Sequence, residues 1–222
     1  MKKTELLKRL KLPDAFDGWQ PVYGTIHGWN GGYEILPKLI HERRPAFIIE
    51  VGAWLGLSTI VMAQALQREN IPDSVVLTVD TWLGSLEHWR DLEPQLGLQS
   101  GFPTLYPRFL HNVASRHCED KIVPLPMPSN IAARLLKHYE LKADLIFLDG
   151  SHDEKDVWDD LNGYMELLAH PSSASGQAGG VICGDDFQWP GVAASVKRYC
   201  AEHNYTYSLT PGAETTYWQI AP

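Results

Sequence analysis

The 222-residue chain has only three cysteines, Cys118, Cys183 and Cys200, and they lie far apart. Thiols so few and so scattered exclude a disulfide scaffold and a zinc ribbon, and they favour a reducing, cytoplasmic environment. Basic residues are also scarce: 19 Lys and Arg stand against 27 Asp and Glu, a formal net charge of −8, and no basic block is present. This balance disfavours a protein that binds duplex nucleic acid by neutralising phosphates. A small-molecule or cationic ligand is compatible with it.

Long apolar runs are absent as well. The stretch nearest to a membrane span, residues 46–67, carries a single charge but also two glycines and several polar side chains. A strand, a glycine turn and a helix fit this pattern better than one apolar span of about 20 residues. The opening residues, MKKTELLKRLKLPD, are basic without the apolar core of a signal peptide, and they predict a short amphipathic helix. We therefore expect a cytoplasmic protein that does not associate with membranes.

The chain does contain short apolar runs that alternate with helical patterns. The runs, each ending in a turn residue or an acid, are 46–51, 74–80, 121–125, 143–149 and 179–185. The helical patterns between and after them cover about 58–69, 103–116, 129–139, 153–168 and 190–202. Continuous apolar runs of this length are typical of strands buried on both faces of a parallel sheet. The alternation therefore predicts a doubly wound α/β fold with helices on both faces.

The remaining segments predict a hairpin, two loops and a cap. The β-rich runs 205–210 and 215–221 flank Pro211-Gly212, and they predict a terminal hairpin on the sheet edge with one antiparallel strand. Residues 171–180 are small and polar, which predicts a flexible loop. Residues 81–103 show no clean period, and long loops of this kind are often lids or binding loops. Residues 1–44, which include the turn-rich GTIHGWNGG, are expected to form an N-terminal cap of helix and loop, followed by one domain at 45–222.

The first predicted strand leads into a glycine turn. In open α/β sheets, ligands bind beyond the carboxyl ends of the strands. Gly52 permits a ligand to approach the main chain, and Gly56 relieves packing where the turn enters the helix. Trp54 occupies the middle glycine position of the dinucleotide fingerprint, which disfavours a pyrophosphate ligand and with it a NAD-dependent dehydrogenase. Taken alone, a bare strand–helix turn explains the two glycines nearly as well.

Polar residues near the first two strand ends extend this pattern. Ser58 or Thr59 can cap the helix that follows the glycine turn. The second strand ends at Asp80, whose carboxylate can accept hydrogen bonds from both hydroxyls of a ribose. The alternative for Asp80 is a helix cap or a solvated loop acid. Trp82 favours the ribose interpretation, because its ring could cover an adenine.

Acids gather after the fourth and fifth predicted strands. Asp149 ends the fourth strand, and Asp185 and Asp186 end the fifth. Adjacent parallel strands would bring the three carboxylates together, where mutual repulsion raises their pKa values unless a divalent cation such as Mg²⁺ or Ca²⁺ is bound. His152, three residues after Asp149, has the residue type of a general base at neutral pH. The alternative is that these acids cap helices and bind backbone amides.

Four motifs in order and in strand context now point to a family. They are E-V-G-x-W-x-G-x-S-T, V-D-T-W, L-D-G-S-H-D and G-G-V-I-C-G-D-D-F. Over roughly residues 45–200 the chain resembles the class I S-adenosylmethionine-dependent methyltransferases. The nearest branch contains the macrolide-sugar O-methyltransferases and the cephalosporin hydroxylase group. The resemblance implies a Rossmann-like, seven-stranded, mostly parallel sheet whose last strand is antiparallel.

The resemblance also implies a site for S-adenosylmethionine. Glu50 and Gly52 would border its methionine part, Asp80 would hold the ribose, and Ser129 or its neighbours would flank the adenine. The full set of expected cofactor-binding residues is Glu50, Gly52, Ala53, Gly56, Ser58, Asp80, Thr81, Trp82, Ser129 and Asp149.

A metal site follows from the same resemblance. In the metal-dependent members an Asp ends the fourth strand, two acids end the fifth, and a His follows the first Asp by three residues. Asp149, Asp185, Asp186 and His152 match that pattern, although the first of the paired acids is often Glu in the relatives. Asp149, Asp185 and Asp186 are the expected metal ligands, and His152 and Asp149 the expected catalytic residues.

The function expected from these residues is Mg²⁺-dependent O-methylation of a small hydroxylated acceptor, such as a sugar, a phenol or a natural product. The cation would lower the pKa of a bound hydroxyl, and His152 would remove its proton. One alternative is a metal-independent methyltransferase of the same fold. Another is a non-catalytic module that binds a nucleotide or a sugar, although such a module has no need of a base beside three acids. A homo-oligomer is compatible with the sequence.

Overall fold

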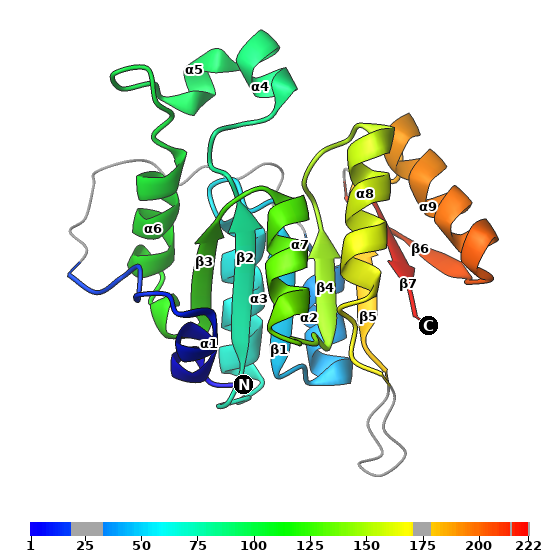
Figure 1. The fold of residues 1–222 in the computed structure, drawn as a ribbon, viewed down its shortest axis with the longest axis horizontal. Helices are drawn as coiled ribbons and strands as arrows, with labels where there is room; N and C mark the ends of the chain where they lie inside the picture. The colour runs from blue at the N-terminus through cyan, green and yellow to red at the C-terminus, as the bar shows by residue number, and fades with distance from the viewer. Residues whose placement is uncertain (19–32, 171–178, 214, 222) are drawn as a thin grey trace.

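The structure is a computed structural model that describes residues 1–18, 33–170, 179–213 and 215–221. Within these ranges the chain forms a seven-stranded sheet covered by helices on both faces (Figure 1). The strands are β1 (Phe47–Val51), β2 (Val75–Asp80), β3 (Ile122–Pro126), β4 (Leu145–Leu148), β5 (Val181–Gly184), β6 (Tyr207–Pro211) and β7 (Thr216–Ile220). The helices are α1 (Lys3–Leu10), α2 (Ile35–Arg43), α3 (Leu57–Arg68), α4 (Leu86–Asp91), α5 (Glu93–Leu96), α6 (Leu105–Ser115), α7 (Ser129–His138), α8 (Glu154–Met165) and α9 (Pro190–His203).

The sheet has the strand order β3-β2-β1-β4-β5-β7-β6. Strands β1 to β5 are parallel, and β7 runs antiparallel to both of its neighbours. The predicted doubly wound, mostly parallel fold with an antiparallel last strand is therefore confirmed, and so is the terminal hairpin. The strand order reverses between β1 and β4, and ligands of open α/β sheets bind outside the carboxyl ends of the strands at such a point.

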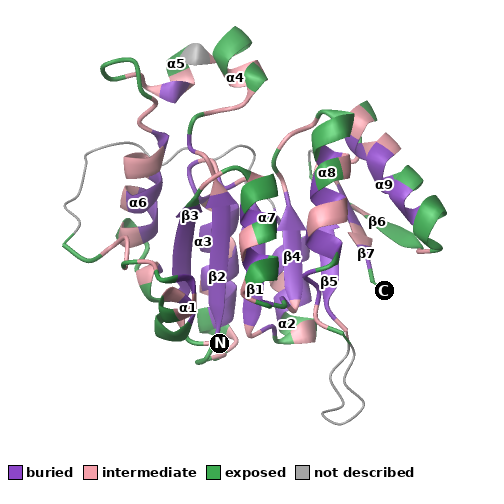
Figure 2. Cartoon of the chain, viewed as in Figure 1, coloured by how far each residue is buried: buried purple, intermediate pink, exposed green. Residues whose placement is uncertain are grey.

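Each face of the sheet has its own hydrophobic core. Ile49 and Val51 of β1 belong to the layer formed with α1, α7, α8 and α9, whereas Ile48 belongs to the layer formed with α2, α3 and α6. All five residues of β1 are buried, and the central strands are buried along most of their length (Figure 2). A fully buried aliphatic side chain contributes about 1.5–3 kcal/mol, so the continuous apolar runs place these strands at the centre.

Two segments have more helix than the sequence predicts. Residues 81–103, expected as a loop, contain the short helices α4 and α5, which lie above the carboxyl ends of the strands (Figure 1). Both are too short to show a helical period in sequence. Helix α2, within the expected cap at 1–44, packs against α3, and its residues Leu36 and Ile40 are fully buried in the core.

Two predicted loops cannot be compared with the structure. The motif GTIHGWNGG (24–32) and most of the loop at 171–180 lie outside the described residues. Among the helices that are described, none combines the length and the apolar character needed to cross a bilayer.

Candidate active site

The glycine turn after β1 is shaped by contacts within the protein. Gly52 has φ +86°, and a Cβ atom there would lie 2.0 Å from the carbonyl oxygen of Asp149. Gly56 has φ +90°, and its Cβ would lie 2.8 Å from the ring of Phe109 in α6. The expected packing relief at Gly56 is therefore seen. Gly52 is required because the turn after β1 touches the turn after β4, so the two turns form one unit.

Glu50 ties β1 to the start of α3. Its carboxyl group is completely buried and accepts hydrogen bonds from the hydroxyls of Ser58 and Thr59, both at 2.5 Å. The prediction that Ser58 or Thr59 caps α3 is wrong: the N-cap is Gly56, so both residues lie in the first turn of the helix, where their hydroxyls donate to Glu50. Burial raises the pKa of Glu50 to about 7, although these donors act in the opposite direction. Neither Glu50 nor Ser58 presents its side chain to solvent.

Asp80 at the end of β2 fastens the glycine turn. Its Oδ2 accepts from the amides of Ala53 (2.9 Å) and Trp54 (2.8 Å), and its Oδ1 accepts from the amide of Trp82 (2.7 Å). Burial raises the pKa of Asp80, and the three amides oppose that shift. Three of the roughly four acceptor positions of a carboxylate are thus filled by the main chain. Asp80, which was predicted to bind the ribose, therefore stabilises the glycine turn after β1.

Trp82 and Thr81 lie at the start of the segment that carries α4. The ring of Trp82 is 2% exposed, packs tilted against Tyr106 and Phe109, and donates from Nε1 to the carbonyl of Trp54. It therefore anchors the segment in the core and does not face the crevice as a cover for an adenine. Thr81 is partly exposed, and its hydroxyl accepts from the amide of Leu83.

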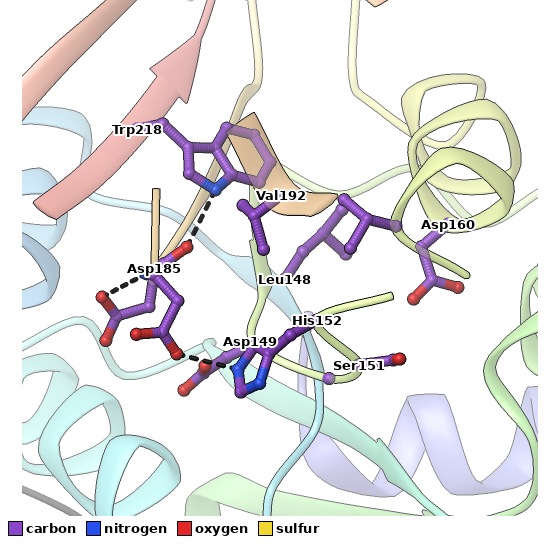
Figure 3. Close-up of a pocket in the computed structure, with 11 residues that line it drawn as sticks. Leu148, Asp149, Ser151, His152, Asp160, Asp185, Val192 and Trp218 are labelled. Carbon is purple, nitrogen blue, oxygen red and sulfur yellow. Dashed lines mark hydrogen bonds and ion pairs between the residues drawn. The ribbon is translucent and has the colours of Figure 1, made fainter. Parts of the chain in front are cut away.

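Ser129 begins α7, after β3. Its side chain hydrogen-bonds the buried carboxyl of Asp160, whose pKa burial raises to about 6, and its carbonyl accepts from the hydroxyl of Tyr164. Both partners belong to α8, so Ser129 joins α7 to α8. Asp160 also lines the hollow that lies beyond β4 and β5 (Figure 3).

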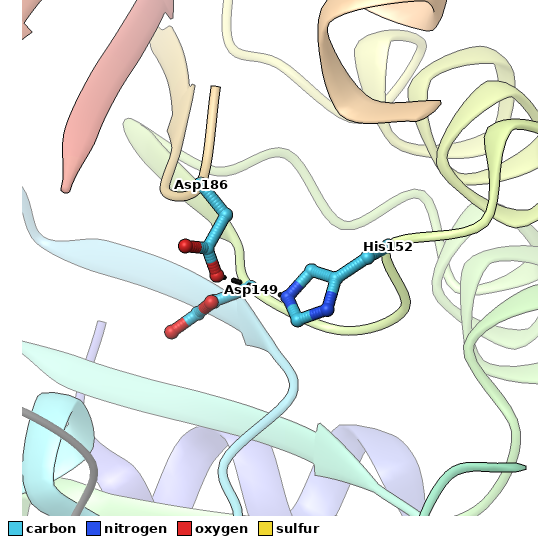
Figure 4. Close-up of side chains that lie close together, drawn as sticks. All are labelled: Asp149, His152 and Asp186. Atoms are coloured by element: carbon cyan, nitrogen blue, oxygen red, sulfur yellow. Dashed lines mark ion pairs between the residues drawn. The ribbon is translucent and has the colours of Figure 1, made fainter. Parts of the chain in front are cut away.

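The acids after β4 and β5 meet in that hollow. Asp149, His152 and Asp186 each offer one ligand atom, and these atoms all lie within 4.8 Å of one another (Figure 4). Burial raises the pKa of Asp149 well above its ordinary value, and the charges of Asp185 and Asp186 add to the shift. The predicted meeting of the two strand ends is therefore observed for Asp149 and Asp186, with His152 beside them.

Asp185 differs from the predicted metal set. Its carboxylate accepts from the Thr215 hydroxyl and from the amide of Asp186 (2.6 Å), so it stabilises the turn after β5 and lies outside the group of converging ligand atoms. Its carbonyl accepts from Nε1 of Trp218 in β7 at 3.1 Å (Figure 3). Asp185 thus connects the turn to the C-terminal hairpin while its charge still acts on Asp149.

His152 is held on three sides. Its Nε2 lies 2.9 Å from Oδ2 of Asp186, its Nδ1 lies 3.6 Å from Oε2 of Glu87, and its ring stacks on Trp189 at 4.5 Å and 17°. Burial lowers the pKa of His152, but Asp186, Glu87 and Asp149 together outweigh it, so the net shift is upward. The imidazole can therefore accept and retain a proton beside the acidic cluster.

These donors fit a cation. Two carboxylates and an imidazole converge, and burial, together with the charges of Asp185 and Asp186, raises the pKa of Asp149. A cation bound beside Asp149 would favour the ionised form of its carboxyl group. Carboxylate oxygens are the ligands of Mg²⁺, and the imidazole extends the choice to transition metals. The cationic sulfonium of a methyl donor suits the same surroundings.

Some residues of this site carry no recognisable signal in the sequence. Glu87 lies in a segment without a period, and Thr215 lies in the hairpin turn, 30 residues after the acid that it binds. Trp189 stands directly before α9, which places it near the fifth strand end but does not predict its stacking on His152.

Comparison with known proteins identifies a family and a fold. The model of the family described as methyltransferase domain matches residues 49–187. The O-methyltransferase of Bacillus cereus in complex with S-adenosylhomocysteine is 15% identical with a TM-score of 0.58, over 100% of this chain and 92% of that chain. The O-methyltransferase NovP is 19% identical with a TM-score of 0.60, over 85% and 79% of the two chains. TomG of Streptomyces achromogenes, an O-methyltransferase involved in tomaymycin synthesis and solved with S-adenosylmethionine, is 15% identical with a TM-score of 0.55, over 98% and 86%. These structures share the fold, and no curated protein matches the chain.

Proposed function

This chain belongs to the methyltransferase domain family and is a class I S-adenosylmethionine-dependent methyltransferase, and we propose that it transfers the methyl group to a hydroxyl of a small acceptor with the help of a divalent cation, most simply Mg²⁺. The observation that carries the proposal is the convergence of Asp149, His152 and Asp186 beyond the carboxyl ends of β4 and β5, next to the point between β1 and β4 where the strand order reverses. A site with two acids and a base at that point serves proton removal better than it serves the binding of a nucleotide alone.

In this proposal the methyl donor, S-adenosylmethionine, lies along the carboxyl ends of the strands. Gly52, Asp80, Thr81 and Asp149, which end β1, β2 and β4, are the predicted cofactor residues that stay partly exposed there. Glu50, Ser58 and Trp82 contribute by fixing the shape of the turn, and Ala53 and Gly56 by forming it. Ser129 follows β3 in the chain but contacts Asp160 and Tyr164 of α8, and its place beside the adenine stays a prediction.

The chain's own residues prepare the acceptor. S-adenosylmethionine supplies a methyl group activated by its sulfonium. Asp149 and Asp186 would hold the cation, which would supply Lewis acidity to lower the pKa of a bound hydroxyl. His152, whose Nε2 lies beside Asp186, accepts the hydroxyl proton. The acceptor oxygen forms the new C–O bond, the C–S bond breaks, and its electron pair stays on sulfur as S-adenosylhomocysteine. Asp185 keeps Asp186 in place.

The rim of the site favours a small acceptor with a flat or sugar-like body. Trp189 flanks His152 and is 44% exposed, and aromatic faces bind such bodies well. Leu86 and Trp89 on α4, the helix that also brings Glu87 to His152, are exposed as well. A sugar, a phenol or a related natural product therefore fits the proposal.

A metal-independent O-methyltransferase is the second candidate. It is favoured by one observation, the direct contact of His152 with Asp186, since an imidazole paired with a carboxylate can remove a proton without a cation.

Thermal unfolding of the full chain with S-adenosylhomocysteine, with and without Mg²⁺, tests these proposals. At 100 times its Kd, a ligand stabilises the protein by about 2.7 kcal/mol, which raises the Tm by several degrees. Mg²⁺ is expected to add a further rise that EDTA reverses and that Asp186→Asn lacks. A rise with S-adenosylhomocysteine but none with Mg²⁺ selects the metal-independent candidate. No rise with S-adenosylhomocysteine contradicts the assignment of the donor site.

A further inference from the structure

The edge of the sheet where the acceptor is proposed to bind is rich in acids. Among the described residues, those that line the hollow beyond β4 and β5 include no lysine or arginine, and they include the four aspartates Asp149, Asp160, Asp185 and Asp186 (Figure 3). We propose that the acceptor is a hydroxyl compound with an apolar ring and a neutral or positively charged body, and that the site excludes acceptors with a carboxylate or phosphate group. The inference rests on the proposed function and names the substrate class of the same site.

The basic side chains nearest to this edge already have partners. Arg90 on α4, the helix above the strand ends, pairs with its neighbour Asp91 at 2.5 Å. Lys155 in the first turn of α8 pairs with Asp159 at 2.5 Å, and Arg108 in the first turn of α6 donates to a main-chain carbonyl of α5 at 2.9 Å. All 19 Lys and Arg of the chain belong to its described part, so none is hidden in the segments that the structure does not describe.

His152 offers no free positive charge either. Its Nε2 lies 2.9 Å from Asp186 and its Nδ1 lies 3.6 Å from Glu87, so a carboxylate stands at each nitrogen whatever the protonation of the ring. A bound Mg²⁺ ion and the sulfonium would together bring three positive charges, which offset the carboxylates of Asp149, Asp185 and Asp186. The side chain of Glu87 is 35% exposed at this place, and an anionic acceptor would therefore meet a carboxylate without a matching cation.

The rim of the site is apolar and aromatic. Trp189 stacks on His152 at 4.5 Å and 17° and is still 44% exposed. On α4, Leu86 is 71% exposed and Trp89 is 45% exposed, while the indole N–H of Trp89 is already donated to a main-chain carbonyl at 2.8 Å. Aromatic faces bind flat rings and attract cations, because the ring face carries partial negative charge. The same surfaces therefore suit a neutral or an amine-bearing ring and provide nothing that holds an anion.

The competing explanation is that the acids serve the fold alone. Glu87 lies in the first turn of α4 and Glu154 in the first turn of α8, where acids are favourable. Asp185 holds the turn after β5 through its contact with Thr215. If these roles were complete and water screened the remaining charge, the charge of the acceptor would not matter.

Three small probes of different charge separate these explanations. Dopamine, hydroxytyrosol and dihydrocaffeate share a ring with neighbouring hydroxyls, and their side chains end in an ammonium, a neutral hydroxyl and a carboxylate. The Kd of each is measured by isothermal titration at neutral pH, with the full chain saturated with S-adenosylhomocysteine and Mg²⁺. We expect dopamine and hydroxytyrosol to bind and dihydrocaffeate to bind at least about 10-fold more weakly than hydroxytyrosol. The difference should narrow in about 0.5 M NaCl, because salt screens the charges.

A lysine at the rim should reverse the exclusion. Leu86→Lys adds a positive charge at an exposed position next to Glu87, and it should tighten the binding of dihydrocaffeate about 10-fold with an unchanged Kd for hydroxytyrosol. Leu209→Lys is the matched control, because Leu209 is 44% exposed on β6 at the far edge of the sheet. The control variant should bind all three probes as the unsubstituted chain does.

Equal Kd values for dihydrocaffeate and hydroxytyrosol would overturn the inference, and so would a failure of both dopamine and hydroxytyrosol to bind. The absence of a gain in Leu86→Lys, or the same gain in Leu209→Lys, would also overturn it, since the charge at the rim would then not decide which probe binds. A chain that does not bind S-adenosylhomocysteine would contradict the proposed function instead.

Discussion

The carboxylate of Asp186 lies against the imidazole of His152, with 2.9 Å between Oδ2 and Nε2. The two residues belong to turns that follow different strands, β5 and β4, so the contact joins the turn that carries the paired acids to the turn that carries the proposed base. Asp186 has φ +58°, a conformation that a non-glycine residue adopts only when its surroundings hold it. Asp185, whose carboxylate accepts from the amide of Asp186 and from Thr215, supplies that hold.

This arrangement predicts different effects for the two neighbouring acids. Asp186→Asn should weaken Mg²⁺ binding more than about 10-fold and leave the Kd for S-adenosylhomocysteine nearly unchanged, because the residue points at the cation site and not at the donor. Asp185→Asn should lower the free energy of unfolding by about 1.5–3 kcal/mol, since hydrogen bonds to a charged group are lost, and weaken Mg²⁺ binding much less. Isothermal titration and urea unfolding of both variants provide the comparison. Equal losses of Mg²⁺ binding would mean that Asp185 is also a ligand.

Replacement of Asp80 should loosen the glycine turn. In Asp80→Asn an amide nitrogen takes the place of one carboxylate oxygen, so at least one of the amides of Ala53, Trp54 and Trp82 loses its acceptor. An unsatisfied buried group costs about 1–3 kcal/mol. We expect a loss of stability of that size in urea unfolding, together with weaker binding of S-adenosylhomocysteine. Unchanged stability would indicate that the carboxylate serves the ligand rather than the turn.

Alanine at position 52 should disrupt the site more than alanine at another glycine with positive φ. Gly101, at φ +82°, has no atom within 4 Å of its would-be Cβ, so Gly101→Ala should cost only about 1 kcal/mol of backbone strain. At Gly52 the same methyl group meets the Asp149 carbonyl at 2.0 Å, and the turn that carries Asp149 and His152 has to move. The free energy of unfolding should therefore fall further in Gly52→Ala than in Gly101→Ala, and the Kd for S-adenosylhomocysteine should rise only in Gly52→Ala. Similar behaviour of the two variants would contradict the close contact of the two turns.

Stability should fall with rising pH on account of Glu50. Its pKa is about 7 in the folded chain against an ordinary value of 4.5, with burial as the main cause and the charge of Asp80 as a further contribution. The stability that Glu50 contributes is therefore fully present below pH 4.5 and lost as the pH rises through about 7. At 1.36 kcal/mol per pKa unit, the loss amounts to about 3 kcal/mol.

Glu50→Gln removes the titration of Glu50. Comparison with the unsubstituted chain therefore separates the effect of Glu50 from that of other acids with raised pKa values, such as Asp160. Urea unfolding at pH 5 and pH 8 should show a smaller pH dependence in Glu50→Gln than in the unsubstituted chain. Parallel pH profiles of the two proteins would show that Glu50 titrates normally.

Much of the fold was predictable because the sheet is buried on both faces. Each continuous apolar run marks a strand, and the β-branched pair of runs around Pro211-Gly212 marks the hairpin, within one or two residues of the observed ends. The meeting of Asp149 and Asp186 follows from the same logic, since neighbouring parallel strands end at the same edge. Helices α4 and α5 were missed because four to six residues are too few to show a helical period.

The choice of hydrogen-bond partners was not predictable from strand ends. Ser58 and Thr59 were expected to cap α3, but the helix already begins at Leu57, and their hydroxyls donate to the buried carboxyl of Glu50. Asp185 was expected to join the metal ligands but binds Thr215, whose position depends on how the hairpin docks. Such contacts join segments 8 to 30 residues apart, and no local pattern records them.

The docking of the hairpin also makes the turn after β5 depend on a segment that is synthesised after it. Strand β7 pairs with β5. The hydroxyl of Thr215 binds the carboxylate of Asp185, and the indole of Trp218 binds its main-chain carbonyl. Gly184 leaves the space that the indole of Trp218 fills, since a Cβ there would lie within 2.5 Å of the ring. A nascent chain that has emerged only as far as α9 already contains every acid of the site, but it lacks the groups that hold the turn after β5. The turn after β5, which carries Asp186, is therefore held only when β7 has paired with β5.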